Sequence, residues 1–187
     1  MSDTLRWTTA DLAALPDNGN RYEIIEGELY MSRQPSWHHQ FACTRLIRVL
    51  DEWSEATDSG VTLGTPGVVF DDDDNVVPDV VWISHARLAT GLDSAGHLTV
   101  APELVIEVLS PGLANAERDA EVKRKLYSRR GVQEYWLVDW QRQQVTVYRR
   151  EHAALVLQAT LFAADTLASP LLPGFACAVR RLFAREV

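Results

Sequence analysis

Cysteine is scarce in this sequence of 187 residues, and long apolar runs are absent. The two cysteines, Cys43 and Cys177, lie far apart, so they form neither a C-x-x-C metal pair nor a disulfide framework. No apolar run reaches the roughly 18 residues of a transmembrane helix. The first residues lack a basic stretch followed by an apolar one, so we expect no signal peptide and a cytoplasmic location.

Lysine is equally rare, since Lys123 and Lys125 are the only lysines among the 18 basic residues. Acidic residues number 26, which gives a net charge of −8, and the excess lies in the first half of the chain. A general nucleic-acid binder carries more positive charge than this, although a local basic face can do the same work. The bias against lysine is either a preference of composition or a sign that one site requires an ammonium group.

The composition is that of a globular protein, with 47% hydrophobic and 24% charged residues. The length fits a single domain over residues 1–187, in which residues 1–19 form an N-terminal extension or short helix. Turn and periodicity signals predict a hairpin of residues 21–25 and 28–32 about Glu26-Gly27, and helices over 38–53 and 115–130. Strands are expected at 61–70, 76–83, 104–109, 134–138, 145–148 and 155–161.

The strand, helix and strand between residues 104 and 138 form a candidate βαβ unit. Its strands are apolar on both faces, which is typical of central strands covered by helices. The remaining strands are hairpin-like. The fold class is therefore α/β, with one mixed sheet flanked by helices and an N-terminal β-hairpin.

Three charged residues break the local pattern. Asp79 stands at the start of an apolar strand, Glu107 lies within the run Leu-Val-Ile-Glu-Val-Leu, and Lys123 follows two alanines on one face of a helix. Each also has an ordinary interpretation: a solvated strand end, a buried ion pair, and a lysine that reaches solvent at the edge of its face. Together they suit phosphodiester hydrolysis, because two carboxylates can bind Mg²⁺ and an ammonium can orient a water.

The motifs YEIIEGELY, SWHHQ, VVPDVVWIS, PELVIEVLSPG and DAEVKRKLYSRRGVQEYWLVD resemble the Uma-type endonuclease family. This family belongs to the PD-(D/E)XK restriction-endonuclease-like superfamily, and the resemblance runs from about residue 20 to the segment 169–174. It implies that Asp79 and Glu107 hold a metal ion, Mg²⁺ or Mn²⁺. The superfamily lysine would stand at position 109, where this chain has Leu109, and Lys123 matches the members that carry it on the following helix.

The hairpin offers a third acid. Glu23 and Glu28 share one face of it if Glu26-Gly27 is the turn, and both match acids that are common in the family. Either can join the metal site, and either can equally be an exposed hairpin acid. His39 also matches a family histidine, and we expect a surface or packing role for it. Tyr127, Tyr135 and Trp136 are interpreted as packing residues, and the spacing of the six tryptophans suggests no platform for stacked bases.

The predicted helix over 115–130 has six basic and three acidic residues. It forms either a basic patch beside the site or an ordinary solvated helix surface. The candidates for phosphate contacts are Arg118, Arg124, Lys125, Arg129 and Arg130.

The sequence thus predicts a metal-dependent endonuclease that acts on nucleic acid, more readily DNA than RNA, and that has no membrane segment. The resemblance also makes a homodimer one option, because many members of the superfamily act on two strands as dimers. One rival hypothesis is an inactive module on the same fold that binds nucleic acid or protein. A second is a two-carboxylate glycosidase, in which Lys123 would have no role.

Overall fold

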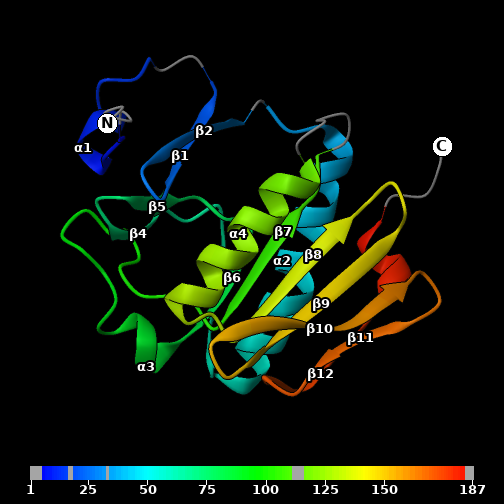
Figure 1. The fold of residues 1–187 in the computed structure, drawn as a ribbon. Coiled ribbons are helices and arrows are strands. Elements are labelled where there is room, and N and C mark those ends of the chain that lie inside the picture. Colours follow the sequence, from blue (N-terminus) through cyan, green and yellow to red (C-terminus); the bar gives the residue numbers. More distant parts are fainter. Residues whose placement is uncertain (1–5, 17–18, 33, 111–115, 184–187) are drawn as a thin grey trace.

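The computed structural model describes residues 6–16, 19–32, 34–110 and 116–183, and for residues 116–119 it describes the backbone alone. Figure 1 shows a central sheet with one long helix on each side and a hairpin layer at one end. The helices are α1 (Thr9–Leu12), α2 (Trp37–Thr57), α3 (His85–Leu88), α4 (Ala116–Arg130) and the 3-10 helix η1 (Val179–Leu182). The strands are β1 (Arg21–Ile25), β2 (Glu28–Ser32), β3 (Gly60–Gly64), β4 (Val68–Asp71), β5 (Asp74–Val76), β6 (Val80–Ser84), β7 (Leu104–Val108), β8 (Glu134–Asp139), β9 (Gln144–Glu151), β10 (Ala154–Phe162), β11 (Thr166–Ser169) and β12 (Leu172–Ala178).

The central sheet has six strands in the order β10-β9-β8-β7-β6-β3. Strands β7 and β8 run parallel and are joined through α4, while the other neighbours are antiparallel. This is the predicted βαβ unit inside a mixed sheet, and the α/β class is confirmed. The predicted hairpin and the second half of the predicted strand over 61–70 form a separate sheet with β5, which was not predicted, in the order β2-β1-β5-β4, and β11 pairs with β12.

The separate four-stranded sheet arises because the predicted strand over 61–70 is broken. Gly64, Pro66 and Gly67 interrupt it, and Thr65 between them has a positive φ of 50°. Its two halves become β3 in the central sheet and β4 in the smaller sheet. The hairpin prediction holds: Ile25 pairs with Glu28, and both Glu26 and Gly27 have positive φ, as a two-residue turn requires.

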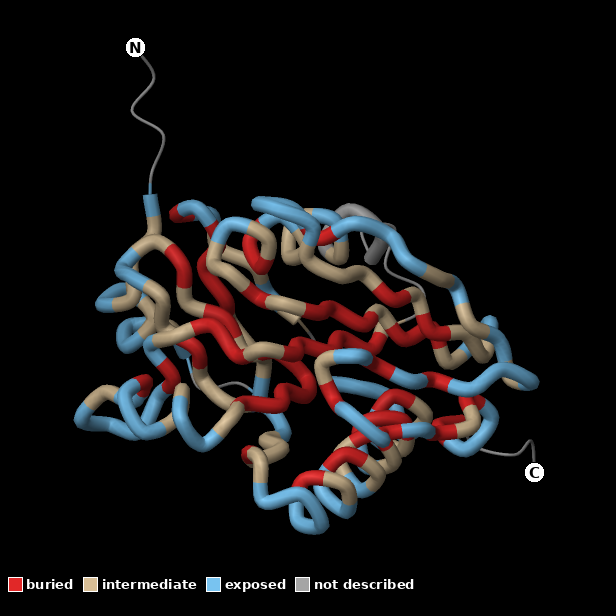
Figure 2. The backbone as a smooth tube through the Cα atoms, turned by 90° about the horizontal axis from the view of Figure 1, so that it is seen from below, coloured by how far each residue is buried: buried red, intermediate tan, exposed pale blue. Residues whose placement is uncertain are grey.

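The two faces of the central sheet hold two apolar clusters, and buried segments run through the middle of the molecule in Figure 2. Leu46 and Leu50 of α2 pack with Trp136 on one face. Leu126 and Tyr127 of α4 pack with Tyr135 on the other. This sandwich explains why β7, on which Glu107 lies, is buried throughout, and why β8, on which Tyr135 lies, is buried except at Leu137.

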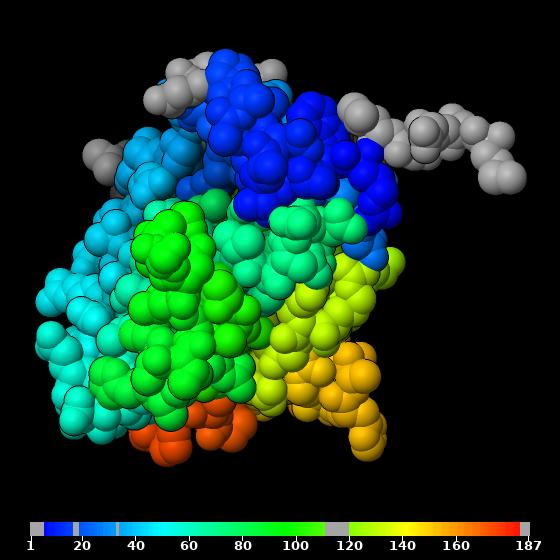
Figure 3. Space-filling view, turned by 90° about the vertical axis from the view of Figure 1, so that its left-hand side faces the viewer, coloured from blue at the N-terminus to red at the C-terminus, as the bar shows by residue number. Residues whose placement is uncertain are grey.

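The N-terminal layer is tied to α4 through charge. In Figure 3 the N-terminal residues lie above the green segment that follows β6, on the same face of the molecule. Asp74 is 3% exposed, accepts hydrogen bonds from Glu26 N–H and the Arg130 guanidinium, and is thereby removed from solvent. The run of four aspartates, Asp71 to Asp74, suits a solvated turn by its charge alone. Asp74 departs from this, because Arg130 of α4 reaches across to it.

Leu46→Ala should lower the free energy of unfolding by about 2–5 kcal/mol, because Leu46 is fully buried between α2 and the sheet. The matched control is Leu157→Ala on β10, where the side chain is 56% exposed and the change should be within about 0.5 kcal/mol. Urea denaturation of the three proteins measures both effects. Equal losses in the two variants would contradict the assignment of the α2 face as core.

Candidate active site

The predicted acids meet at one end of the central sheet. The antiparallel ladder pairs Val80 with Ile106, so its extension by one step places Asp79 opposite Glu107. Strand β1 brings Glu23 to the same place from the smaller sheet, and α4 brings Lys123 from above. Glu23, Asp79 and Glu107 are 5%, 5% and 8% exposed. Three carboxylates that are this well buried require compensating partners.

Lys123 is the partner that joins two of them. Its Nζ lies 3.0 Å from Glu23 Oε1 and 3.0 Å from Glu107 Oε1. Burial lowers the pKa of Lys123, but the charges of the carboxylates around it outweigh burial and raise the pKa above its ordinary value. The amine is therefore an ammonium ion at neutral pH, and it spans the two sheets.

Glu107 carries the most perturbed carboxyl group. Its Oε1 also accepts a hydrogen bond of 2.7 Å from the Tyr127 hydroxyl, one helical turn from Lys123. Burial raises the pKa of Glu107, the Lys123 ammonium lowers it in part, and the neighbouring carboxylates raise it again, to about 7. Among the described residues, the hydrogen bonds and ion pairs of Glu107 all go to Oε1, so Oε2 remains available to a ligand.

Asp79 is held by donors from three directions. Its Oδ2 accepts from the Val108 N–H at 2.9 Å and lies 3.1 Å from His39 Nε2, and its Oδ1 lies 3.2 Å from Arg21 NH1. Burial raises the pKa of Asp79, but the hydrogen bond from His39, the charge of Lys123 and the hydrogen bond from the Val108 N–H together lower it below its ordinary value. Asp79 is thus an ionised and fixed carboxylate, in contrast to Glu107.

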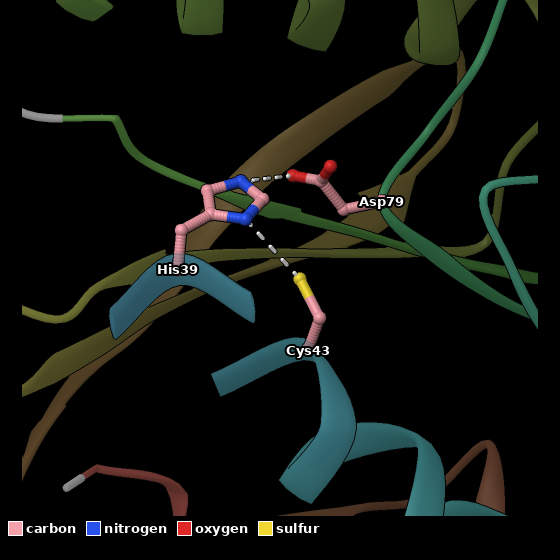
Figure 4. A group of neighbouring side chains, drawn as sticks. All are labelled: His39, Cys43 and Asp79. Carbon is pink, nitrogen blue, oxygen red and sulfur yellow. Dashed lines mark hydrogen bonds and ion pairs between the residues drawn. The ribbon is translucent and has the colours of Figure 1, made fainter. Parts of the chain in front are cut away.

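His39, at the start of α2, is part of this site and was missed by the sequence analysis. It is 4% exposed, and Figure 4 shows its ring between Asp79 and Cys43, whose Sγ lies 3.6 Å from Nδ1. Burial, together with the charges of Asp79 and Glu107, raises the pKa of the Cys43 thiol. A protonated thiol that donates to Nδ1 leaves the proton on Nε2, which then donates to Asp79.

The four charged residues open onto a cavity of about 250 Å³. The hairpin, the start of α2, the end of β7, α4 and β8 all contribute to its lining. Tyr135 of β8 also lines it, and the Tyr135 hydroxyl is buried without a hydrogen-bond partner in the described part of the chain. Glu107 lines the same cavity, and a buried hydroxyl without a protein partner indicates that a polar ligand belongs here.

The donor set fits a hard divalent cation. Asp79, just before β6, and Glu107, on β7, supply carboxylate oxygens, which are the ligands that Mg²⁺ and Mn²⁺ prefer. Arg21 shares Asp79 Oδ1, whereas Glu107 Oε2 has no protein partner among the described residues. One ligand atom each from His39, Cys43 and Asp79 also lies within 4.8 Å of the others, a grouping that can hold a softer ion. Such an ion would take up a thiolate with release of the Cys43 proton, and it would replace the contacts that both ring nitrogens of His39 make with Asp79 and Cys43.

The remaining predicted residues lie outside this cluster. Glu28 is exposed and accepts a hydrogen bond from Tyr30, so Glu23 is the hairpin acid that reaches the site. On α4, Arg124 pairs with Glu121, Arg129 with Glu26 and Arg130 with two aspartates, while Lys125 is exposed and 3.9 Å from Glu121. The side chain of Arg118 lies outside the described residues.

The comparisons agree with this architecture. The model of the Uma2 family, described as "putative restriction endonuclease", matches residues 9–180, and the chain therefore belongs to that family. A crystal structure described as a putative nuclease of the DUF820 family from Anabaena variabilis is 21% identical, with a TM-score of 0.75 over 94% of this chain and 97% of that chain. At this identity the likeness shows the fold. No curated protein matches the sequence, and no helix within the described ranges is long and apolar enough to cross a membrane.

The raised pKa of Glu107 predicts how stability depends on pH. The carboxyl has an ordinary pKa of 4.5 and a native pKa of about 7. Native protein therefore binds the proton more tightly than unfolded protein does, and stability contributed by Glu107 falls as pH rises from about 4.5 through about 7. In EDTA at pH 8, Glu107→Gln should therefore melt at a higher temperature than the parent. At pH 5 this difference in melting temperature should be smaller.

Thermal denaturation at the two pH values measures this difference. Glu55→Gln, an exposed position on α2, is the control for the loss of one negative charge. If the melting temperatures of Glu107→Gln and the parent differ by the same amount at pH 5 and pH 8, the pKa of Glu107 is not raised in the native protein.

Proposed function

We propose that this chain is a metal-dependent endonuclease that hydrolyses phosphodiester bonds, with DNA as the first substrate to test. The observation that carries the proposal is the convergence of Asp79, Glu107 and Lys123 at one cavity, with Glu107 Oε2 free of protein partners among the described residues. Membership of a family described as restriction endonucleases supports the same reaction class.

Each residue has a role that follows from its contacts. Asp79 and Glu107 would hold the metal ion, and Glu23 would support the site through Lys123. A bound Mg²⁺ or Mn²⁺ would supply Lewis acidity toward a phosphoryl oxygen and would lower the pKa of a bound water. Lys123 keeps its proton, so it acts by orienting the attacking water and by offsetting the negative charge that develops on the phosphate. Tyr135 offers a hydroxyl to the same cavity.

The contacts of Lys123 also weigh on the rival hypotheses. In a glycosidase the lysine has no task, whereas here it bridges Glu23 and Glu107. The inactive binding module needs no free carboxylate oxygen in the cavity, yet it is compatible with the net charge of −8. Binding of nucleic acid with no turnover under any divalent metal would favour that module.

Asp79→Asn and Glu107→Gln should each abolish metal-dependent nicking of supercoiled plasmid. We expect losses that exceed the 10–100-fold typical of residues that only support a metal ligand. Isothermal titration with Mn²⁺ should show lost or weakened binding in both, while Glu55→Gln behaves as the parent. Unchanged Mn²⁺ binding in both variants would remove the metal assignment, even if nicking were lost.

Lys123→Met should separate catalysis from metal binding. The variant lacks the ammonium, so nicking should fall by about 10²–10³-fold, the range for the loss of one group that stabilises the transition state. Mn²⁺ binding should persist, because the carboxylates remain and a nearby positive charge is gone. Circular dichroism at low temperature checks that the variant is folded, and nicking at the parental rate would show that Lys123 is only structural.

A further inference from the structure

Three aromatic rings form a stack beside the cavity. The Trp37 ring lies on the His38 ring with centroids 3.8 Å apart and an interplanar angle of 29°. The His38 ring in turn lies on the Trp140 ring, at 4.2 Å and 1°. We call Trp37, His38 and Trp140 the ring stack. Trp37 is 57% exposed at its outer end, so a further planar group can be added there.

Local structure fixes both sides of the ring stack. Ser36 caps α2 by accepting a hydrogen bond from the His39 N–H, which sets the first turn of the helix that carries Trp37 and His38. Trp140 follows β8 in a turn held by Asp139, which accepts from the N–H groups of the two residues after Trp140. The rings are therefore arranged before any ligand arrives, which lowers the entropic cost of binding.

The segments that carry the ring stack also contribute to the cavity lining. Pro35, just before α2, and His39, in its first turn, both line the cavity. On the sheet side, Leu137 of β8 lines the cavity as well, and the Val138 carbonyl accepts from the N–H of Leu109 at the cavity edge. The cavity lining thus extends to residues next in sequence to Trp37 and His38.

We propose that the ring stack is a subsite for a nucleobase of single-stranded nucleic acid, stacked on Trp37. This inference rests on the proposed function for its substrate class. Aromatic rings bind bases of any sequence by stacking, and their contribution does not depend on positive charge. That suits a chain with a net charge of −8, in which Arg129 and Arg130 are already paired with acids. Arg45, over the Phe41 ring next to Trp37, adds one cation nearby.

The preference for a single strand follows from the geometry of duplexes. Bases inside a duplex are already stacked on both faces, so a protein ring can reach them only after they are extruded. A single strand presents its bases without that cost. A protein partner is less suited to this surface, because one exposed tryptophan is far smaller than the roughly 800 Å² that each side of a stable interface buries.

The test compares Trp37→Ala with Phe162→Ala, an aromatic of similar exposure (54%) on β10. Fluorescence anisotropy in the presence of Ca²⁺ measures how tightly each protein binds a labelled single strand of about 12 nucleotides, and how tightly it binds the duplex of the same sequence. Trp37→Ala should weaken binding to the single strand about tenfold, and Trp37→Phe should restore part of it. Phe162→Ala should bind as the parent, and the duplex affinity should be the same in all four proteins.

The outcomes separate the subsite from the nuclease. If Trp37→Ala binds the single strand as tightly as the parent, the subsite is wrong, even where the parent nicks DNA with Mg²⁺. If Trp37→Ala binds more weakly and the parent nicks nothing with any metal, the subsite stands and the nuclease proposal fails. A parent that binds no single strand overturns the subsite. Self-association that Trp37→Ala abolishes, with unchanged DNA binding, would reassign the surface to contact between two copies.

Discussion

The ion cluster around Lys123 is the constraint on which the rest of the structure depends. One ammonium holds Glu23 of the small sheet and Glu107 of the central sheet within 3.0 Å. Without it, two buried carboxylates from different sheets would face each other uncompensated. The docking of the hairpin layer and the position of α4 follow from this single arrangement. Burial raises the pKa of Glu107, and the Lys123 ammonium offsets part of that rise. Arg130, bound to Asp74, fixes the far end of the same helix.

Much of the fold was accessible from local sequence signals. The turn at Glu26-Gly27, the helix that ends at Gly131 and the parallel pair around it were all predicted, because each rests on short-range geometry. The assignment of strands to sheets was not, since a break at Thr65 sends two halves of one apolar run to different sheets. Such partition depends on tertiary contacts, which periodicity does not encode.

Some residues of the candidate site could likewise be predicted from the sequence, and others could not. Asp79, Glu107 and Lys123 stood out because charged residues in apolar surroundings violate a local rule. His39 and Tyr135 violate none, since a histidine at a helix start and a tyrosine in a strand are ordinary, and only their neighbours reveal them. The ring stack joins residues about one hundred positions apart, so no spacing along the chain could indicate it. Tyr135 pairs with Val105 across β7 and β8, two residues from Glu107 along β7.

The position of Lys123 on a helix, and not on a strand of the sheet, has a mechanical consequence. Asp79 and Glu107 are positioned by the hydrogen-bonded backbone of neighbouring strands, and this backbone is rigid. Lys123 is positioned by the side-chain packing of α4, through Leu126 and Tyr127 in the core beneath it. A helix can slide on a sheet by a fraction of a turn without breaking its own hydrogen bonds. The ammonium is therefore the adjustable member of the cluster, and changes in the packing beneath α4 tune it while the carboxylates stay still.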